Sequence, residues 1–152
     1  TGRPISWMGK AEAMRWPVLG WFLRKNGVFG VRRGAADLEA FRLAERVLNE
    51  GRILGIYPEG TRSPDGRLRP FRDGAALLAL RSGVPVFPVA VSGTDGLWRK
   101  GSLLPRRVPR VALAIGPQVA LPVASGHRPD LAAVSAAMHD AVAALLPASN
   151  RP

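Results

Sequence analysis

Residues 52–74 constrain this chain most, because they join a short apolar run to a loop dense in polar groups. The apolar run, residues 53–57, has the length of a buried strand, and Pro58 ends it because proline has no N–H to donate to a central ladder. The next four residues place a carboxylate, a bare backbone, a hydroxyl and a guanidinium directly after the strand. Ligands of open α/β sheets bind at the carboxyl ends of strands, so the sequence predicts a site here.

These four residues suit the recognition of an anion beside a reacting hydroxyl. Gly60 lets a ligand approach the backbone, and Arg62 offers a planar fork that matches two phosphate oxygens. Thr61 supplies a hydroxyl, and the carboxylate of Glu59 accepts hydrogen bonds. The alternative is a polar surface turn in which Glu59 and Arg62 form a solvated pair worth about 0.5 kcal/mol or less.

Seven consecutive residues, Tyr57-Pro-Glu-Gly-Thr-Arg-Ser63, resemble the Phe-Pro-Glu-Gly-Thr-Arg-Ser motif of the glycerolipid acyltransferases typified by 1-acyl-glycerol-3-phosphate acyltransferase. Residues 27–33, which end in an arginine, and residues 84–91, which carry prolines in an apolar run, are similar to two further blocks of that family. The resemblance runs from about Pro4 to about Thr94. It implies an enzyme of phospholipid biosynthesis that transfers a fatty acyl group from acyl-CoA or acyl carrier protein to the hydroxyl of lysophosphatidic acid or a similar lysophospholipid.

The resemblance implies a basic cluster for the acceptor phosphate. Arg33 and Arg62 hold the phosphate, and Lys10 resembles a lysine that some members of the family place near it. For Lys10 an ordinary surface lysine is the alternative.

The remaining substrate-binding residues implied by the resemblance are uncharged or acidic. Glu59 and Gly60 shape the acceptor site, and Thr61 lends a hydroxyl. Pro88 resembles a proline near the acyl or acceptor pocket, and its place inside an apolar run predicts a bulge or a kink that faces a ligand.

The general base of the family is not matched in this sequence. The family uses a His-x-x-x-x-Asp motif in which the histidine acts on the acceptor hydroxyl and the aspartate orients it. The two histidines, His127 and His139, lack an aspartate five residues on, and both read as surface or helix-packing residues. We therefore expect the catalytic residues upstream of Thr1, and we expect this chain alone to be inactive. The alternative is a non-catalytic lipid-binding remnant of the family.

Composition indicates one domain. A chain of 152 residues is long enough for a single core, and we expect a domain over residues 1–147 followed by a disordered tail over residues 148–152. No cysteine is present, so a disulfide frame and a cysteine-based zinc site are excluded; no motif suggests another metal, and no cofactor is expected beyond the acyl donor.

The net charge of +11 favours anionic partners. A basic nucleic-acid-binding module is a distant alternative, but it requires aromatics interleaved with the charges, and the aromatics here gather between Trp7 and Phe29. We expect no nucleic-acid partner.

Residues 14–25 are rich in tryptophan and flanked by basic residues. This composition suits a helix at a membrane surface, and a buried core helix is the alternative. No apolar run approaches the roughly 18 residues that span a bilayer. We expect a peripheral or monotopic protein at the cytoplasmic face of a membrane.

The pattern of elements predicts an α/β domain with a mixed sheet flanked by helices. Asp37 and Asp130 suit helix caps. One predicted apolar helix face carries Leu38, Phe41, Ala44 and Leu48. The expected strands are residues 4–8, 28–31, 53–57, 84–91 and 111–115, and the expected helices begin at residues 17, 38, 73 and 131.

Overall fold

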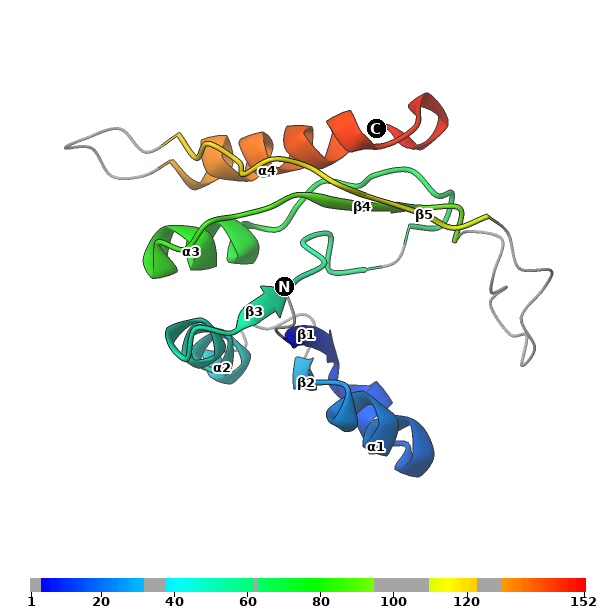
Figure 1. The fold of residues 1–152 in the computed structure, drawn as a ribbon, viewed down its shortest axis with the longest axis vertical. Helices are drawn as coiled ribbons and strands as arrows, with labels where there is room; N and C mark the ends of the chain where they lie inside the picture. Colours follow the sequence, from blue (N-terminus) through cyan, green and yellow to red (C-terminus); the bar gives the residue numbers. More distant parts are fainter. Residues whose placement is uncertain (1–3, 32–37, 62, 95–109, 123–129) are drawn as a thin grey trace.

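The computed structural model describes residues 4–31, 38–61, 63–94, 110–122 and 130–152 (Figure 1). Helices and strands alternate, which confirms the predicted α/β class. The elements in chain order are β1 (Ile5–Lys10), the 3-10 helix η1 (Ala11–Arg15), α1 (Pro17–Lys25), β2 (Val28–Val31), α2 (Leu38–Asn49), β3 (Ile53–Gly55), α3 (Asp73–Ser82), β4 (Val89–Ser92), β5 (Ala112–Ile115), α4 (Leu131–Leu145) and the 3-10 helix η2 (Ala148–Asn150).

The first sheet is parallel and has β1 at its centre, in the order β2-β1-β3. Trp7 of β1 pairs with Val28 on one side and with Gly55 on the other. Parallel neighbours need crossover connections, which α1 and α2 supply. Because the three strands run in one direction, their carboxyl ends lie at one edge of the sheet.

The helix α1 begins and ends as its sequence predicts. Pro17 occupies the first turn, where a missing N–H costs nothing, and Gly27 takes a positive φ of 74° just beyond the end. The side chains of Trp16, Trp21 and Phe22 are 68%, 58% and 55% exposed, so they are not part of the core. Across the described ranges, no helix is both long and apolar enough to cross a membrane.

The second sheet pairs β4 with β5 in antiparallel register, so the strands of the described residues form two sheets. The strand expected over residues 84–91 was placed too early: β4 begins at Val89, after both prolines. Pro88 cannot donate to a ladder, and its carbonyl instead accepts a bond from the Gly116 N–H at 3.0 Å. Ala90 is buried, while Val91 and Leu113 lie on the opposite, exposed face.

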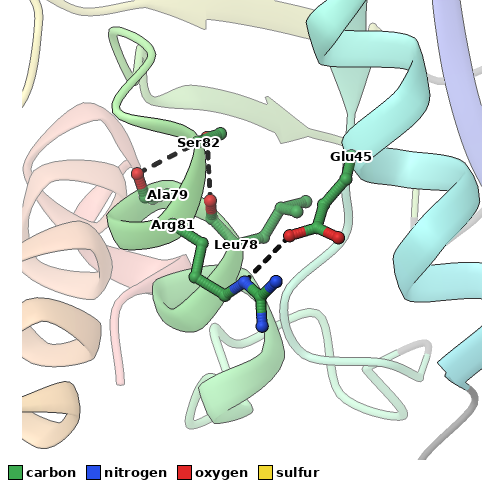
Figure 2. A network of polar contacts seen from close by, with 5 residues as sticks. All are labelled: Glu45, Leu78, Ala79, Arg81 and Ser82. Carbon is green, nitrogen blue, oxygen red and sulfur yellow. Dashed lines mark hydrogen bonds and ion pairs between the residues drawn. The ribbon is translucent and has the colours of Figure 1, made fainter.

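Three helices pack around a core of small side chains. In Figure 1, α3 lies between α2 and α4. Figure 2 shows the contact of α2 with α3, where Arg81 Nε lies 2.8 Å from Glu45 Oε1. Small side chains let helices approach closely. The buried apolar residues are Ala40, Ala44, Val47, Ala76, Leu78, Ala79, Ala90, Val134 and Leu146.

The structure differs from the sequence-based prediction at three further places. The strand expected over residues 53–57 ends at Gly55, because the chain already turns toward Pro58. The turn expected after Met8 is displaced, since β1 continues to Lys10. In place of the expected disordered tail, η2 forms and Asn150 bonds to Gly66 and Leu68.

Candidate functional site

The signature segment, residues 57–63, leaves the carboxyl end of β3 as predicted. β1 ends beside it at Lys10, and parallel pairing brings these strand ends to one sheet edge. β2 ends at Val31, two residues before Arg33. Arg33 and Arg62 lie outside the described residues, so their phosphate-binding roles stay predictions, as does the role of the Lys10 side chain.

The backbone conformation of the signature segment requires a glycine at position 60. Its φ is +67°, a region that other residues rarely adopt. A Cβ atom at this position would lie 2.7 Å from Nε of Arg72, and the N–H of Arg72 donates to the Pro58 carbonyl at 2.9 Å. The Arg72 side chain therefore lies directly against the bare backbone of Gly60 and brings a guanidinium to the signature.

Glu59 is oriented by a backbone donor from the following loop. Its Oε2 accepts the N–H of Arg69 at 3.1 Å, and the side chain is partly buried. Among the described residues, this is the one hydrogen bond found to the Glu59 carboxylate, and it engages Oε2 alone. Thr61 is exposed, so its hydroxyl is accessible to a ligand.

An aromatic pair borders the signature on the sheet side. The rings of Trp7 and Tyr57 stack with centroids 5.8 Å apart. Gly55 makes room for this arrangement, because a Cβ there would collide with the Trp7 ring. Tyr57 remains 61% exposed, so the pair presents an apolar surface next to Glu59.

The downstream loop, residues 63–72, is a structured turn. Ser63 Oγ donates to Asp65 Oδ1 at 2.8 Å, and the Arg67 N–H donates to the same oxygen at 3.1 Å. Both bonds lower the pKa of the Asp65 carboxyl from its ordinary value of 3.8, and the bond from Ser63 has the larger effect. A hollow of about 360 Å³ lies along this loop, between Pro64 and Pro152, and the signature residues do not line it.

Pro88 and His139 are placed by packing. Pro88 is buried, and its Cγ would lie 2.8 Å from a Cβ at Gly116, so its ring occupies the space that this glycine leaves. His139 packs edge-on against Phe71, with centroids 5.0 Å apart, and its Nδ1 lies 3.4 Å from Asp140 Oδ1. This agrees with the predicted helix-packing role of His139. His127 lies outside the described residues.

Two residues of the site were not predicted. Arg72 approaches Gly60, and Asn150 bonds to the downstream loop. The similarity of residues 70–74, Pro-Phe-Arg-Asp-Gly, to a Pro-Phe-Lys-x-Gly segment of the acyltransferases was the available signal for Arg72. No sequence signal marks Asn150. In the described part of the chain, no group of three or more acidic, histidine or cysteine side chains is placed to hold a metal ion.

Comparison with known proteins identifies similar sequences. The sequence profile of the family described as Acyltransferase matches residues 1–92. The 1-acyl-sn-glycerol-3-phosphate acyltransferase of Limnanthes alba is 40% identical over 111 residues, which cover 70% of this chain and 40% of that protein. The lyso-ornithine lipid O-acyltransferase of Pseudomonas aeruginosa is 43% identical over 91 residues, covering 59% of this chain and 35% of that protein.

A solved structure is also similar. The 1-acyl-sn-glycerophosphate (LPA) acyltransferase of Thermotoga maritima matches with a TM-score of 0.57 and 31% identity, covering 75% of this chain and 45% of that one. The chain therefore spans less than half the length of these relatives.

Proposed function

Because the chain belongs to the acyltransferase family, we propose that the protein transfers an acyl group from a thioester donor, acyl-CoA or acyl carrier protein, to the free hydroxyl of a lysophospholipid such as lysophosphatidic acid. The observation that carries this proposal is the signature segment at the carboxyl end of β3, where the Arg72 side chain lies against Gly60 and the Arg69 N–H donates to Glu59. The names of the relatives from Limnanthes alba and Pseudomonas aeruginosa each specify a lipid acceptor, which supports the acceptor class.

The reaction assigns distinct tasks to the side chains. A general base takes the proton of the acceptor hydroxyl, the oxygen attacks the thioester carbonyl, and the C–O bond forms. The C–S bond then breaks, and the protonated base returns the proton to the departing thiolate. In this scheme Arg33 and Arg62 hold the acceptor phosphate, and Thr61 offers a hydroxyl to the same group. The carboxylate of Glu59, fixed on one side by Arg69, accepts from a polar group of the acceptor.

The general base in this proposal lies outside the chain. His139 packs against Phe71 and lies beside the exposed carboxylate of Asp140, which supports a packing role for this histidine. We expect a His-x-x-x-x-Asp motif upstream of Thr1 in the complete gene product. Loss of a general base typically lowers the rate by about 10²–10⁴.

Thiol release from acyl-CoA tests the proposal. The complete gene product should release thiol in a manner that depends on added lysophosphatidate, and the 152-residue chain alone should remain at background. Acceptor-dependent release by the chain alone contradicts the placement of the base. Background release by the complete gene product with either donor contradicts the enzyme and favours the lipid-binding remnant.

We also propose that α1 contacts a membrane surface, from which a lipid acceptor is taken. Trp16, Trp21 and Phe22 expose most of their surface, and Arg24 and Lys25 supply positive charge in the last turn. The Lys25 ammonium lies 5.1 Å from the Trp21 ring centroid, so charge and aromatic surface are adjacent. Indole rings favour the interface, and each nearby cation adds about 1 kcal/mol on anionic lipid. The exposure of these side chains weighs against the alternative of a core helix.

This arrangement suits peripheral or monotopic attachment. The cytoplasmic face is the side that we propose, since both candidate acyl donors would approach from there.

A further inference from the structure

The end of the chain holds the tip of the downstream loop. Asn150 Nδ2 donates to the Gly66 carbonyl at 2.9 Å, and the Leu68 N–H donates to the Asn150 carbonyl at 3.0 Å. The first bond joins residues 84 positions apart, and Asn150 is partly buried. Asn150 donates one of these bonds and accepts the other, so together they fix both the distance and the orientation of the loop relative to Asn150.

The same loop orients the signature segment. Arg69 follows Leu68 directly, and its N–H is the donor that holds Glu59 Oε2 at 3.1 Å. The amides of Leu68 and Arg69 lie on consecutive peptide units joined at the Leu68 Cα, so a displacement of Leu68 shifts the donor of Glu59 unless rotation about φ and ψ of Leu68 compensates for it. A continuous path of contacts therefore leads from Asn150 through Leu68 and Arg69 to the carboxylate of Glu59.

The segment that carries Asn150 is itself anchored. α4 is capped by Asp130, whose Oδ1 accepts the Ala132 N–H at 2.9 Å, and the buried Leu146 follows its last residue as the C-cap. Arg151 Nε donates to the Leu146 carbonyl at 3.1 Å, which ties the residues after η2 back to the helix end. Asn150 thus projects from the fixed end of a helix.

We propose that Asn150 is a positioning residue for the acceptor site, which it supports by fixing the downstream loop that holds Glu59. This inference rests on the proposed acyl transfer. It concerns acceptor binding alone, because Glu59 belongs to the residues assigned to the acceptor. A residue that merely stabilises the fold would lower the active fraction and leave both Michaelis constants unchanged.

Steady-state kinetics of the complete gene product test the inference, with lysophosphatidate and acyl-CoA varied in turn. Asn150→Ala removes the side-chain donor and keeps the backbone bond to Leu68. It should raise the acceptor KM by roughly three- to tenfold, the effect of one hydrogen bond, and leave the donor KM and kcat within about twofold. Amide exchange of Leu68 should also become faster.

Two further variants separate hydrogen bonding from shape. Asn150→Asp keeps the shape but places a carboxylate oxygen against the Gly66 carbonyl at neutral pH, so its acceptor KM should rise at least as much as that of Asn150→Ala. Ser149→Ala is the matched control, because Ser149 Oγ donates to Asn150 Oδ1, which takes part in neither loop bond, so its loss leaves both loop bonds in place.

The outcomes distinguish this inference from the function on which it rests. Background turnover of the wild type refutes the proposed function and the inference with it. Normal wild-type turnover with an unchanged acceptor KM in both Asn150 variants overturns the inference alone. A lowered kcat with both KM values unchanged, or wild-type kinetics in Asn150→Asp, also overturns it, since these results indicate stability or shape.

Discussion

Substitution of Gly60 by alanine should destabilise the protein through two separable effects. The φ of +67° costs a residue with a Cβ about 1–2 kcal/mol. The new Cβ would also lie 2.7 Å from Nε of Arg72, closer than side-chain contacts allow. Since Arg72 is exposed and its side chain can swing away, we take the low end of overpacking costs, about 1 kcal/mol.

A second glycine provides a matched control. Gly51 has a φ of +68°, and a Cβ there would meet no atom within 4 Å. Gly51→Ala carries the same conformational cost and the same loss of unfolded-state entropy, but no steric cost. We expect Gly60→Ala to lower the free energy of unfolding by about 1 kcal/mol more than Gly51→Ala does.

Denaturant unfolding of the complete gene product and the variants measures this difference. Arg72→Ala keeps the backbone bond to Pro58 and removes the obstructing side chain, so in that background Gly60→Ala should cost no more than Gly51→Ala. Equal losses for Gly60→Ala and Gly51→Ala in the wild-type background, or no rescue by Arg72→Ala, would refute the reasoning.

Four other predictions concern the acceptor, the last helix, acid stability and the membrane. Arg62→Lys keeps the charge but loses the bidentate fork, so it should lower kcat/KM for the acceptor by the equivalent of about 1–3 kcal/mol and leave kcat/KM for the donor unchanged. If Arg33→Lys lowers kcat/KM for the acceptor and Arg62→Lys does not, Arg62 has a structural role. Asp130→Ala removes the cap of α4 and should lower the free energy of unfolding by about 1 kcal/mol, whereas the exposed Asp140→Ala should have little effect on the same denaturation curve. The pKa of Asp65 is lower in the folded protein, so its ionised carboxylate stabilises the fold above pH 3.8, and this stabilisation is lost as the pH falls through the folded pKa. Asp65→Asn should therefore lose less stability below pH 3.8 than the wild type does. Parallel curves of stability against pH for the two proteins would exclude this contribution. Binding to sedimented vesicles should rise with anionic lipid and fall when Trp16 and Phe22 are changed to Ser in a protein that still melts cooperatively, and unfolding of that variant would place both side chains in the core.

Local signals predicted most of the elements correctly. Val28–Val31 forms β2 as expected, Pro17 begins α1, and Asp130 caps α4. These features depend on residues near one another in the chain: proline fixes its own φ, and an aspartate reaches the second N–H of the helix that it precedes. Periodicity likewise predicted a helix at α2 and the burial of Ala44, which is 0% exposed. It wrongly placed Leu38, which is 66% exposed, on the buried face and missed Val47, which is 2% exposed.

The signature segment could be located from sequence, but its supports could not. Residues 57–63 begin just after β3, and Pro58 keeps the ladder from continuing through them, so the position of the site depends on local chemistry. The partners of that segment lie farther along the chain: Arg69 at Glu59, and Arg72 at Gly60. Contacts between loop residues ten or more positions apart produce no periodic pattern in the sequence, so these supports could not be predicted from it.

The sequence by itself determined the α/β class, the family and the position of the signature, because each of these depends on short segments whose residue types restrict the backbone. Only the tertiary structure decided that Trp16 and Phe22 are exposed, that Pro88 is buried against Gly116, and that Asn150 bonds to Gly66. Burial depends on which surfaces meet after the chain has folded, and a hydrogen bond between residues 84 positions apart exists only when helix and loop are brought together.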